Sequence, residues 1–507
     1  MSPSTLFECL QTVGDKTRVA VSAPERPDLD HAGLLGLCQK TTDQLNSFGI
    51  GRNDRVAIVL PNGPEMATAF VAVACAATTA PLNPAYREDE FKFYLNDLSA
   101  KALIVETGSE SPAVAAARDL GIPLIELDVT EGAAAGDFTL NAPSLNSTAS
   151  RPGLAGTEDV GLILHTSGTT SRPKIVPLSQ KNLAASARNI SATLKLEPTD
   201  RCMNIMPLFH IHGLIAAVLT SLSAGASVYC TPGFNALKVF SWLVDSKPSW
   251  YTAVPTMHQA ILGRASRNSE VVANAKLKFI RSSSSSLPPQ VMAELEETFG
   301  CPVVEAYGMT EATHQMACNP LPPAARKAGT VGIAAGPEVA IMANDGSLLA
   351  PGETGEIVIR GDNVTAGYEN NDTANAEAFT EGWFRTGDQG VMDDEGYVSI
   401  TGRLKEIINR GGEKISPREV DEVLMDHPAV GQVVTFAIPH DKLGEEVAAV
   451  VVLREGQEAT EREIRDFTAQ RLADFKVPRK IIFMEEIPKG ATGKLQRIGL
   501  AEKLGLV

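Results

Sequence analysis

The segment from Thr166 to Lys174, which reads Thr-Ser-Gly-Thr-Thr-Ser-Arg-Pro-Lys, limits the fold more than any other part of the chain. It directly follows the apolar run 160–164, which predicts a buried strand ending in a polar loop. Gly168 allows the backbone to approach an anion closely, the hydroxyl groups can donate hydrogen bonds to phosphate oxygens, and Lys174 adds a positive charge. The spacing is not that of a Walker A motif. The segment is therefore a candidate phosphate-binding loop, with an ordinary polar loop as the alternative. The residues expected to contact phosphate are Thr166, Ser167, Gly168, Thr169, Thr170 and Lys174.

Strand-like and helix-like segments alternate in the first part of the chain. The runs 55–60, 102–105 and 160–164 are apolar and short, whereas 63–77 has the length of a helix. This alternation predicts α/β layers with mainly parallel strands. Residues 107–156 are rich in Ala, Gly, Ser and Pro, and we expect them to form a weakly constrained surface excursion.

The last part of the chain has a different character. Ser416 and Glu419 are spaced as in a capping box and predict a helix start, and Thr460 with Glu463 predicts another. We expect these helices to combine with short strands in a compact α+β unit of roughly a hundred residues, which is a plausible small domain. The expected segments are a helix over 417–426 and strands over 432–438, 447–453 and 480–484.

The composition is that of a globular enzyme. With 507 residues, 44% hydrophobic and 21% charged, the chain has the length of about three domain-sized units. A net charge of −16 opposes sequence-independent binding to nucleic acid or to anionic membranes. Seven cysteines without a C-x-x-C pair indicate reduced thiols. No signal peptide or membrane-spanning run is evident, so we expect a cytoplasmic protein.

Further motifs follow the loop in a fixed order. They are Tyr307-Gly-Met-Thr-Glu311, Trp383-Phe-Arg-Thr-Gly-Asp388, Gly402-Arg403-Leu-Lys405 with Gly411-Gly412, and Pro488-Lys-Gly-Ala-Thr-Gly-Lys494. Together with the loop they resemble the motifs of the adenylate-forming enzymes, which include acyl-CoA synthetases, luciferases and the adenylation domains of peptide synthetases. The resemblance implies a large N-terminal AMP-binding body of several subdomains over 1–402, a hinge at 403–405 and a small mobile C-terminal lid over 406–507.

The resemblance also implies roles for residues of the nucleotide site. Glu311 matches the acidic residue that holds Mg²⁺, and Thr310 beside it matches a phosphate contact. Tyr307 is expected to stack on adenine. Asp388 matches the residue that accepts hydrogen bonds from both ribose hydroxyl groups, and Arg403 is expected to assist it. Ser284 is also expected near the nucleotide.

Three further positions are expected to act through movement of the lid. Lys494 matches the lysine that reaches the α-phosphate and the carboxylate during adenylation. Lys405 occupies the hinge position. Gly411 and Gly412 are expected to line the path of the attacking thiol in the second half-reaction, when the lid has rotated.

The acid to be activated is indicated mainly by histidines. Four histidines fall in motifs that border the acyl pocket of this superfamily, namely His210, His212, His258 and His314. Imidazoles can donate hydrogen bonds or positive charge to a second carboxylate, and His210, His258 and His314 are the candidate pocket residues. Ser284 and Ser285 add hydroxyl groups where many relatives have Gly and Ala. The alternatives are that His210 is a common gate residue and that His258 is structural.

The sequences of several motifs resemble those of plant and fungal oxalate:CoA ligases. The chain departs from the broader pattern at Ile175, where a Gly is usual, and at Gln180, where many members have His. The resemblance implies a carboxylate:CoA ligase that uses ATP, Mg²⁺ and CoA and acts on oxalate through an acyl-AMP intermediate. Malonate or a coumarate-type acid, a luciferase-like adenylating oxidoreductase and a nucleotide-binding sensor without turnover remain alternatives.

Overall fold

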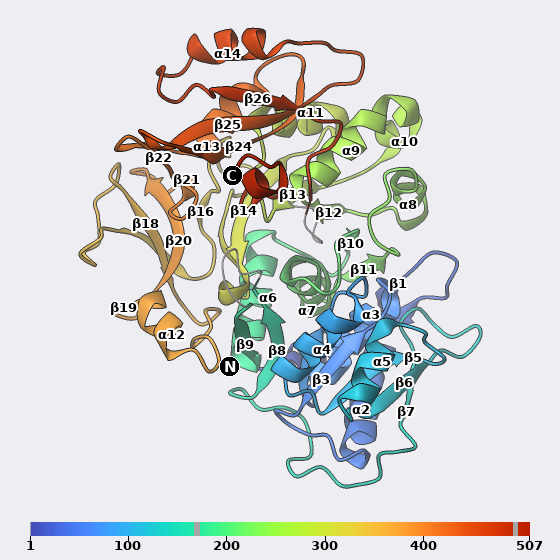
Figure 1. Cartoon of the computed structure of the whole chain (residues 1–507). Helices are drawn as coiled ribbons and strands as arrows, with labels where there is room; N and C mark the ends of the chain where they lie inside the picture. The colour runs from blue at the N-terminus through green and yellow to red at the C-terminus, as the bar shows by residue number, and fades with distance from the viewer. Residues whose placement is uncertain (1, 167–172, 490–494) are drawn as a thin grey trace.

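The structure is a computed structural model that describes residues 2–166, 173–489 and 495–507. Within these residues the chain forms four sheets covered by helices (Figure 1). Phosphate-loop residues 167–172 and the lid residues 490–494 lie outside the described part. In that part, no helix is both long enough and apolar enough to cross a membrane.

A seven-stranded sheet occupies the N-terminal part, in the order β7-β6-β5-β3-β4-β8-β9. The five strands β3, β4, β5, β6 and β8 are parallel, and the edge strands β7 and β9 are antiparallel to their neighbours. The prediction of mainly parallel α/β layers is confirmed. The strands are β3 (Arg55–Val59), β4 (Thr78–Pro81), β5 (Ala102–Glu106), β6 (Leu124–Asp128), β7 (Thr139–Asn141), β8 (Val160–His165) and β9 (Ile175–Ser179).

The prediction of a surface excursion over 107–156 is wrong for much of that segment. It contains α5 (Pro112–Asp119) and both β6 and β7. The composition was misleading because Ala113, Ala116 and Ala117 are buried helix residues rather than loop residues. Their small side chains let α5 pack closely against the sheet.

A nine-stranded sheet follows, in the order β16-β15-β14-β13-β12-β10-β11-β1-β2. Its central strands are parallel, whereas β15 returns antiparallel to β14. The strands are β1 (Val19–Ser22), β2 (Leu29–Asp30), β10 (Arg201–Asn204), β11 (Ser227–Cys230), β12 (Trp250–Ala253), β13 (Phe279–Ser283), β14 (Val303–Met309), β15 (His314–Cys318) and β16 (Ile333–Ala334).

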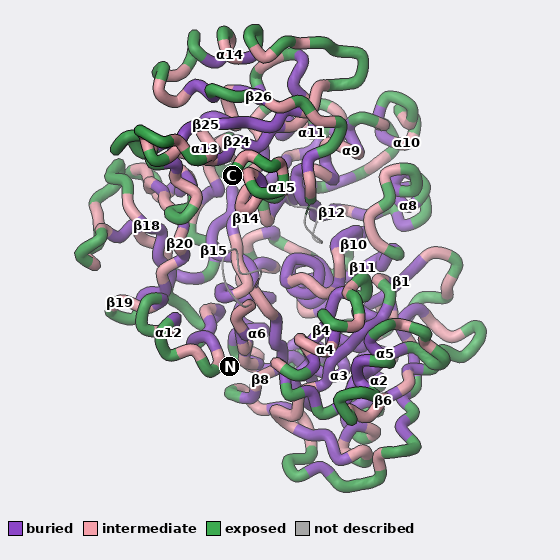
Figure 2. Tube along the Cα trace, in the orientation of Figure 1, coloured by how far each residue is buried: buried purple, intermediate pink, exposed green. Residues whose placement is uncertain are grey.

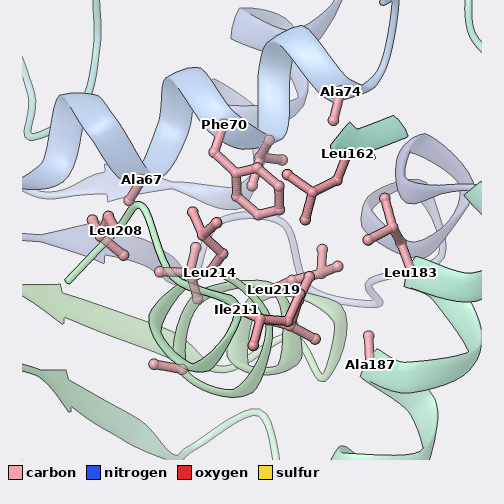
Figure 3. Close-up of a cluster of buried hydrophobic side chains, with 14 of the residues drawn as sticks. Ala67, Phe70, Ala74, Leu162, Leu183, Ala187, Leu208, Ile211, Leu214 and Leu219 are labelled. Carbon is pink, nitrogen blue, oxygen red and sulfur yellow. The ribbon is translucent and has the colours of Figure 1, made fainter. Parts of the chain in front are cut away.

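The largest core lies between these two sheets. Phe70 on α3 packs toward Leu214 and Leu219 of the π-helix η1, and Leu183 of α6 closes the cluster from the side (Figure 3). Packing in this core fixes the position of η1, and with it the position of His212, which is the first residue of η1. The helices around the sheets are α1 (Leu6–Gln11), α2 (His31–Ser47), α3 (Pro64–Ala74), α4 (Glu88–Asp97), α6 (Gln180–Thr193), η1 (His212–Leu219), α7 (Thr220–Ser223), α8 (Val239–Ser246), α9 (Pro255–Ala265), η2 (Ser266–Asn268), α10 (Ser269–Asn274) and α11 (Pro289–Phe299).

Two smaller sheets complete the chain, and the second belongs to the C-terminal part shown in orange and red in Figure 1. Thr460 and Glu463 form the expected capping box, and the Ser416 side chain accepts a hydrogen bond from the Glu419 backbone N–H as expected. Figure 2 shows that β14 and β15 are mostly buried, whereas much of α14 is exposed. The remaining elements are η3 (Thr310–Ala312), β17 (Glu338–Met342), β18 (Thr354–Arg360), α12 (Asp372–Ala378), β19 (Phe379–Thr380), β20 (Trp383–Met392), β21 (Val398–Arg403), β22 (Ile408–Arg410), β23 (Glu413–Ile415), α13 (Pro417–Met425), β24 (Val430–His440), β25 (Gly444–Leu453), α14 (Glu461–Ala469), β26 (Lys480–Phe483) and α15 (Leu500–Lys503).

Candidate active site

One hairpin, β14–η3–β15, carries several of the expected site residues. Met309 pairs with His314 across the hairpin, and Glu311 lies in the turn η3 between the strands. The backbone approach is very close, because a Cβ atom on Gly308 would lie 1.8 Å from the His314 carbonyl oxygen. The Gly of the Tyr-Gly-Met-Thr-Glu motif is therefore required by packing, and the hairpin brings Tyr307, Thr310, Glu311 and His314 to one end of the sheet.

Tyr307, Asp388 and Arg403 form one hydrogen-bonded group. The Tyr307 hydroxyl donates to Asp388 Oδ2, and Arg403 Nε donates to Asp388 Oδ1 at 2.9 Å. Asp388 and Arg403 are register partners on β20 and β21, which explains why two residues distant in sequence meet here. The negative charge of Asp388 raises the pKa of Arg403, and burial raises the pKa of Tyr307. The carboxylate is thus held in place with lone pairs left to accept further hydroxyl groups.

Glu311 is buried beside a positive charge. Its Oε1 accepts a hydrogen bond from the Tyr368 hydroxyl at 2.8 Å, and Lys174 Nζ lies 4.3 Å from the centroid of the Tyr368 ring. Burial raises the pKa of the Glu311 carboxyl, and the Tyr368 hydrogen bond and the charges of Arg403 and Lys174 oppose that shift. Because burial still raises the pKa of this carboxyl, a further cation close to it would stabilise its charged form.

The ends of the phosphate loop lie together near this carboxylate. The backbone N–H of Thr166 donates to the Lys174 carbonyl at 3.0 Å, which closes the loop at its base. The roles predicted for Ser167, Gly168, Thr169 and Thr170 lie outside the described residues.

A second polar group, the histidine cluster, lies deeper in the sheet and consists of His212, Thr252, Arg281, Ser284 and His314. The His212 and His314 rings stack with centroids 5.0 Å apart. His212 Nδ1 lies 3.0 Å from Ser284 Oγ, and His212 Nε2 lies 2.6 Å from Thr252 Oγ1. Arg281 places its guanidinium 3.1 Å from His314 Nε2 and 3.4 Å from His212 Nε2.

The backbone is strained at two members of this cluster. Ser284 has φ of 72° and His314 has φ of 98°, both in the left-handed region that side chains other than Gly rarely adopt. Such strain concentrates at functional sites, where the surrounding structure maintains it. The roles of Ser284 and His314 in the acyl pocket stay a prediction.

The other predicted pocket residues lie differently. His210 is half-buried at the entrance to η1, where its Nδ1 accepts the His212 backbone N–H at 3.4 Å, and Ser285 is exposed. His258 is fully buried on α9 against Tyr251, and burial lowers its pKa to about 3. Successive strand residues face opposite sides of a sheet, and Ile280 packs with α9 while Arg281 points to η1. The structure therefore does not bring His258 to the histidine cluster.

The C-terminal residues can be placed only around the loop that carries Lys494, which itself lies outside the described residues. Just beyond that loop, Arg497 donates to Glu406 at 2.6 Å and to Asp421 at 2.5 Å, and its Nε donates to the Thr435 carbonyl at 2.6 Å. This group ties the end of the loop to the segment after Lys405. Lys405 is exposed in the turn between β21 and β22.

Gly411 and Gly412 form the turn between β22 and β23. Both have positive φ, of 61° and 101°, and both are exposed. Their predicted place along the thiol path belongs to another lid pose and stays a prediction.

A cleft of about 440 Å³ lies where Lys489 of the C-terminal part meets the body. Its lining is mainly apolar and includes Phe209, next to His210. The cleft therefore lies beside the candidate gate residue. Other lining residues are Leu60, Leu82, Pro207, Phe234 and Met257.

Comparison with known proteins agrees with this geometry. The family described as AMP-binding enzyme matches residues 11–369, and the AMP-binding enzyme C-terminal domain matches residues 419–494. The chain belongs to the AMP-binding enzyme family. It is 46% identical over 506 residues to an oxalate–CoA ligase of Arabidopsis thaliana, covering 98% of both chains. It is 44% identical over 446 residues to an oxalate–CoA ligase of Saccharomyces cerevisiae, covering 83% of this chain and 81% of the relative.

Solved structures share this fold. ATP-bound MatB from Rhodopseudomonas palustris aligns with a TM-score of 0.88 at 28% identity and covers 99% of both chains. The predicted fold class, a layered α/β body with a C-terminal α+β part, is confirmed.

Several residues of this AMP-binding enzyme site were not singled out from the sequence. The sequence could have indicated Arg281, because a charged residue inside the buried strand Phe279–Ser283 is unusual. His212 was named with His210 in a motif that borders the acyl pocket, but it was not assigned a role of its own. Tyr368 and Thr252 gave no signal, since an isolated Tyr or Thr is ordinary in a loop or a strand. Gln180 departs from the family pattern for a structural reason, because its amide bonds Leu6 and Ala74 in the core.

Proposed function

We propose that this protein is an ATP-dependent oxalate:CoA ligase. In the first half-reaction an oxalate oxygen attacks the α-phosphorus of ATP, and pyrophosphate leaves to give oxalyl-AMP. In the second, the CoA sulfur attacks the acyl carbon, and AMP leaves to give oxalyl-CoA. The proposal is supported by the similarity to two oxalate–CoA ligases, one of them along almost the whole chain.

The histidine cluster is the observation that carries the choice of acid. A long-chain acid needs an apolar tunnel, because unpaired polar groups in contact with it would cost free energy. Here His212, His314 and Ser284 instead place polar groups beside the hairpin that carries Tyr307 and Glu311. A short acid with a second carboxylate fits such a lining, and oxalate is the shortest.

The nucleotide contacts follow from the geometry of the hairpin. Tyr307 is our candidate to stack on adenine, and Asp388, already oriented by Tyr307 and Arg403, accepts the ribose hydroxyl groups. Lys174 and Thr166 bring the base of the phosphate loop toward the triphosphate. Fixed donors of this kind stabilise the negative charge that develops on the phosphoryl group and the departing pyrophosphate.

The residues present fit a magnesium ion. Glu311 is the candidate ligand because its carboxylate is buried and its pKa is raised, so that a divalent cation would compensate a costly charge. When bound, Mg²⁺ would neutralise phosphate charge and orient the triphosphate. Thr310, at the start of η3, is the neighbouring candidate phosphate contact.

Residues 406–507 are proposed to act as a lid over the body, which spans 1–402, with a hinge at 403–405. Lys494 would neutralise the α-phosphate and the attacking carboxylate in the first half-reaction. The lid would then rotate and bring Gly411 and Gly412 to the path of the CoA thiol, for which the cleft beside Phe209 is our candidate entry. We also propose a cytoplasmic location, supported by seven free cysteines.

A panel of acids tests the proposed function. Pyrophosphate release is measured with MgATP and oxalate, malonate, 4-coumarate, acetate or a medium-chain acid, each with and without CoA, and acyl-CoA is identified by mass. We expect oxalate to give the highest kcat/KM, with oxalyl-CoA formed only when CoA is present. A preference for malonate or 4-coumarate would overturn the choice of acid, and no pyrophosphate release with any acid would overturn the activity.

A further inference from the structure

Arg281 is a buried cation with an unusual set of neighbours. Its side chain is 0% exposed, and among the residues that the structure describes it makes no ion pair with a carboxylate. Its guanidinium instead faces two imidazole rings, the hydroxyl of Thr252 and the amide oxygen of Gln315. Burying a guanidinium without a counter-ion is costly. A functional role would explain why the chain retains it.

The recorded hydrogen bonds around Arg281 favour one arrangement of protons. A guanidinium has donors and no acceptor, so every atom that it contacts must accept. His314 Nε2, 3.1 Å from Arg281 Nη2, must therefore carry a lone pair. Gln315 agrees with this arrangement, because its amide nitrogen donates to the Ala335 carbonyl and leaves Oε1 to accept from Arg281.

The same reasoning fixes His212. Arg281 Nη1 lies 3.4 Å from both Thr252 Oγ1 and His212 Nε2. In this arrangement the Thr252 hydroxyl accepts a hydrogen bond from Arg281 and donates one to His212 Nε2 at 2.6 Å. The ring proton of His212 then sits on Nδ1, which donates to Ser284 Oγ at 3.0 Å. Ser284, having accepted this bond, keeps its own hydroxyl proton to donate.

The charge of the cluster follows from its composition. A neighbouring cation disfavours a second positive charge, so Arg281 opposes protonation of both rings. Burial lowers the pKa of Arg281 to about 10, which still leaves it charged at neutral pH. Among the described residues, the thiols of Cys202 and Cys318 also act on the Arg281 charge, and burial raises the pKa of both, so they add no charge. His210 borders His212 from the chain before η1.

We infer that Arg281 is a positioning residue for acid recognition, which keeps His212 and His314 neutral with their protons on Nδ1. The second carboxylate of the acid then meets oriented N–H and O–H donors, with the positive charge of Arg281 one layer behind them. This goes beyond the expectation that the imidazoles themselves could supply positive charge. The inference rests on the proposed function for the identity of the acid, but not for the state of the histidines.

The first test uses the unmodified protein and needs no substrate. With ¹⁵N-labelled histidine, NMR reports which ring nitrogen carries the proton, and His212→Gln and His314→Gln assign the signals. We expect both rings to be neutral Nδ1–H tautomers from about pH 6 to about pH 8, around the usual histidine pKa. A doubly protonated ring at neutral pH, or an Nε2–H tautomer at either residue, would overturn the inference.

The second test removes the cation with Arg281→Met. We expect KM for oxalate at about pH 8 to rise by about tenfold to a hundredfold, because the N–H and O–H donors that bind the charged acid lose their fixed orientation, while kcat changes less. The freed histidines should titrate near their usual pKa, so KM should fall as the pH falls through about 6.5, a dependence absent from the wild type. Arg281→Lys keeps a charged donor and should restore part of the affinity.

Arg201→Met is the matched control. Arg201 lies in the same sheet on β10 and bonds Ser246 and Ser227 rather than a histidine, so its loss should leave the histidine signals and the pH profile unchanged. Wild-type histidine signals and a wild-type pH profile in Arg281→Met would contradict the inference. If Arg281→Met does not fold, the wild-type NMR measurement still decides. If another acid is preferred over oxalate, the proposed function fails while the histidine signals remain a test of Arg281.

Discussion

Single residues at the site act through partners that the fold supplies. Asp388 is oriented by Tyr307 and Arg403, and Glu311 is bonded by Tyr368. Because these partners already hold the site side chains in place without substrate, the side chains would need little reorganisation when negative charge develops on the phosphoryl group. Removing one group should therefore affect one step more than another, which makes individual roles separable by kinetics.

Substitution of His314 tests the acid-binding end. In His314→Ala we expect kcat/KM for oxalate to fall by about tenfold to a hundredfold, since a hydrogen bond to a charged group contributes about 1.5–3 kcal/mol. A monocarboxylate has no second charge to hold and should lose less. Steady-state kinetics with oxalate and acetate check this, with His427→Ala, a histidine that packs on Phe467 in the C-terminal part, as the control. Unchanged oxalate turnover would remove His314 from the pocket.

Substitution of Lys494 tests the division of labour between the half-reactions. Lys494→Ala should slow acyl-AMP formation by about 10²–10³, the scale of losing one preorganised electrostatic group. Thioester formation from supplied acyl-AMP should stay near normal, because Lys494 is proposed to serve only adenylation. Rapid-quench measurement of each half-reaction compares the two. Lys480→Ala, which removes an exposed lysine on β26 of the same C-terminal part, is the control. Equal losses in both half-reactions would contradict the assignment.

At the scale of elements, β14 connects the site to the C-terminal part. It carries Tyr307 at the site and Glu305 at 1% exposure, whose Oε1 accepts the Leu287 backbone N–H at 2.9 Å. Burial raises the pKa of Glu305 to about 7, and Arg418 on α13 opposes the shift. The strand that carries the candidate site residue Tyr307 thus also carries, two residues earlier, a buried carboxyl group whose ionisation is unfavourable.

This carboxylate makes stability depend on pH. Because the folded-state pKa of about 7 lies above the usual 4.5, the folded protein binds this proton more tightly than the unfolded chain. The contribution of Glu305 to the free energy of unfolding is therefore largest below about pH 4.5 and falls as the pH rises through about 7. Glu305→Gln removes the ionisation, so its apparent melting temperature relative to the wild type should rise by a few degrees between about pH 5 and about pH 8.

Calorimetry across this pH range checks the prediction. The exposed Glu297 on α11 provides the control, and Glu297→Gln should shift the melting temperature little at any pH. A difference between Glu305→Gln and wild type that does not change with pH would show that Glu305 is not protonated near neutral pH in the folded protein.

At the scale of the whole molecule, few polar contacts join the C-terminal part to the body among the residues that the structure describes. Gln259 donates to the Gly431 carbonyl at 3.3 Å, Gln290 to Asp426, and Ser416 to the Thr401 carbonyl. Few contacts mean that little is lost when the two parts separate, as a rotating lid requires. The chain crosses between the two sheets in the turn around Lys405.

Lys405→Pro tests this rotation. Proline fixes φ near −65° and should favour one lid pose, so the ratio of adenylation to thioester formation should change by about tenfold or more, equivalent to a barrier change of about 1.4 kcal/mol. Among the described residues no hydrogen bond from the Lys405 backbone N–H is recorded, so the loss of that donor should cost little. Separate assays of the half-reactions measure the ratio, and Lys405→Ala is the control. An unchanged ratio would argue against a hinge at this residue.

The sequence by itself determined the α/β class, the parallel strands and the order of the motifs. These are local properties: apolar runs, capping residues such as Thr460 and Glu463, and a glycine-containing loop after a strand are all readable within a few residues. Local composition also misled, since the alanines of α5 look like a loop until a sheet covers them.

Only the tertiary structure decided which polar residues meet. Tyr307 and Asp388 are bonded across 81 residues of sequence, and Arg281 reaches His314 across 33. Whether His258 or His212 joins the cluster depends on which face of the nine-stranded sheet each one lies on, and no local pattern states that. Strand pairing sets the distances between these residues in space. The pairing itself is stabilised by burial of apolar side chains throughout the sheet, and not by the polar residues that the sheet brings together.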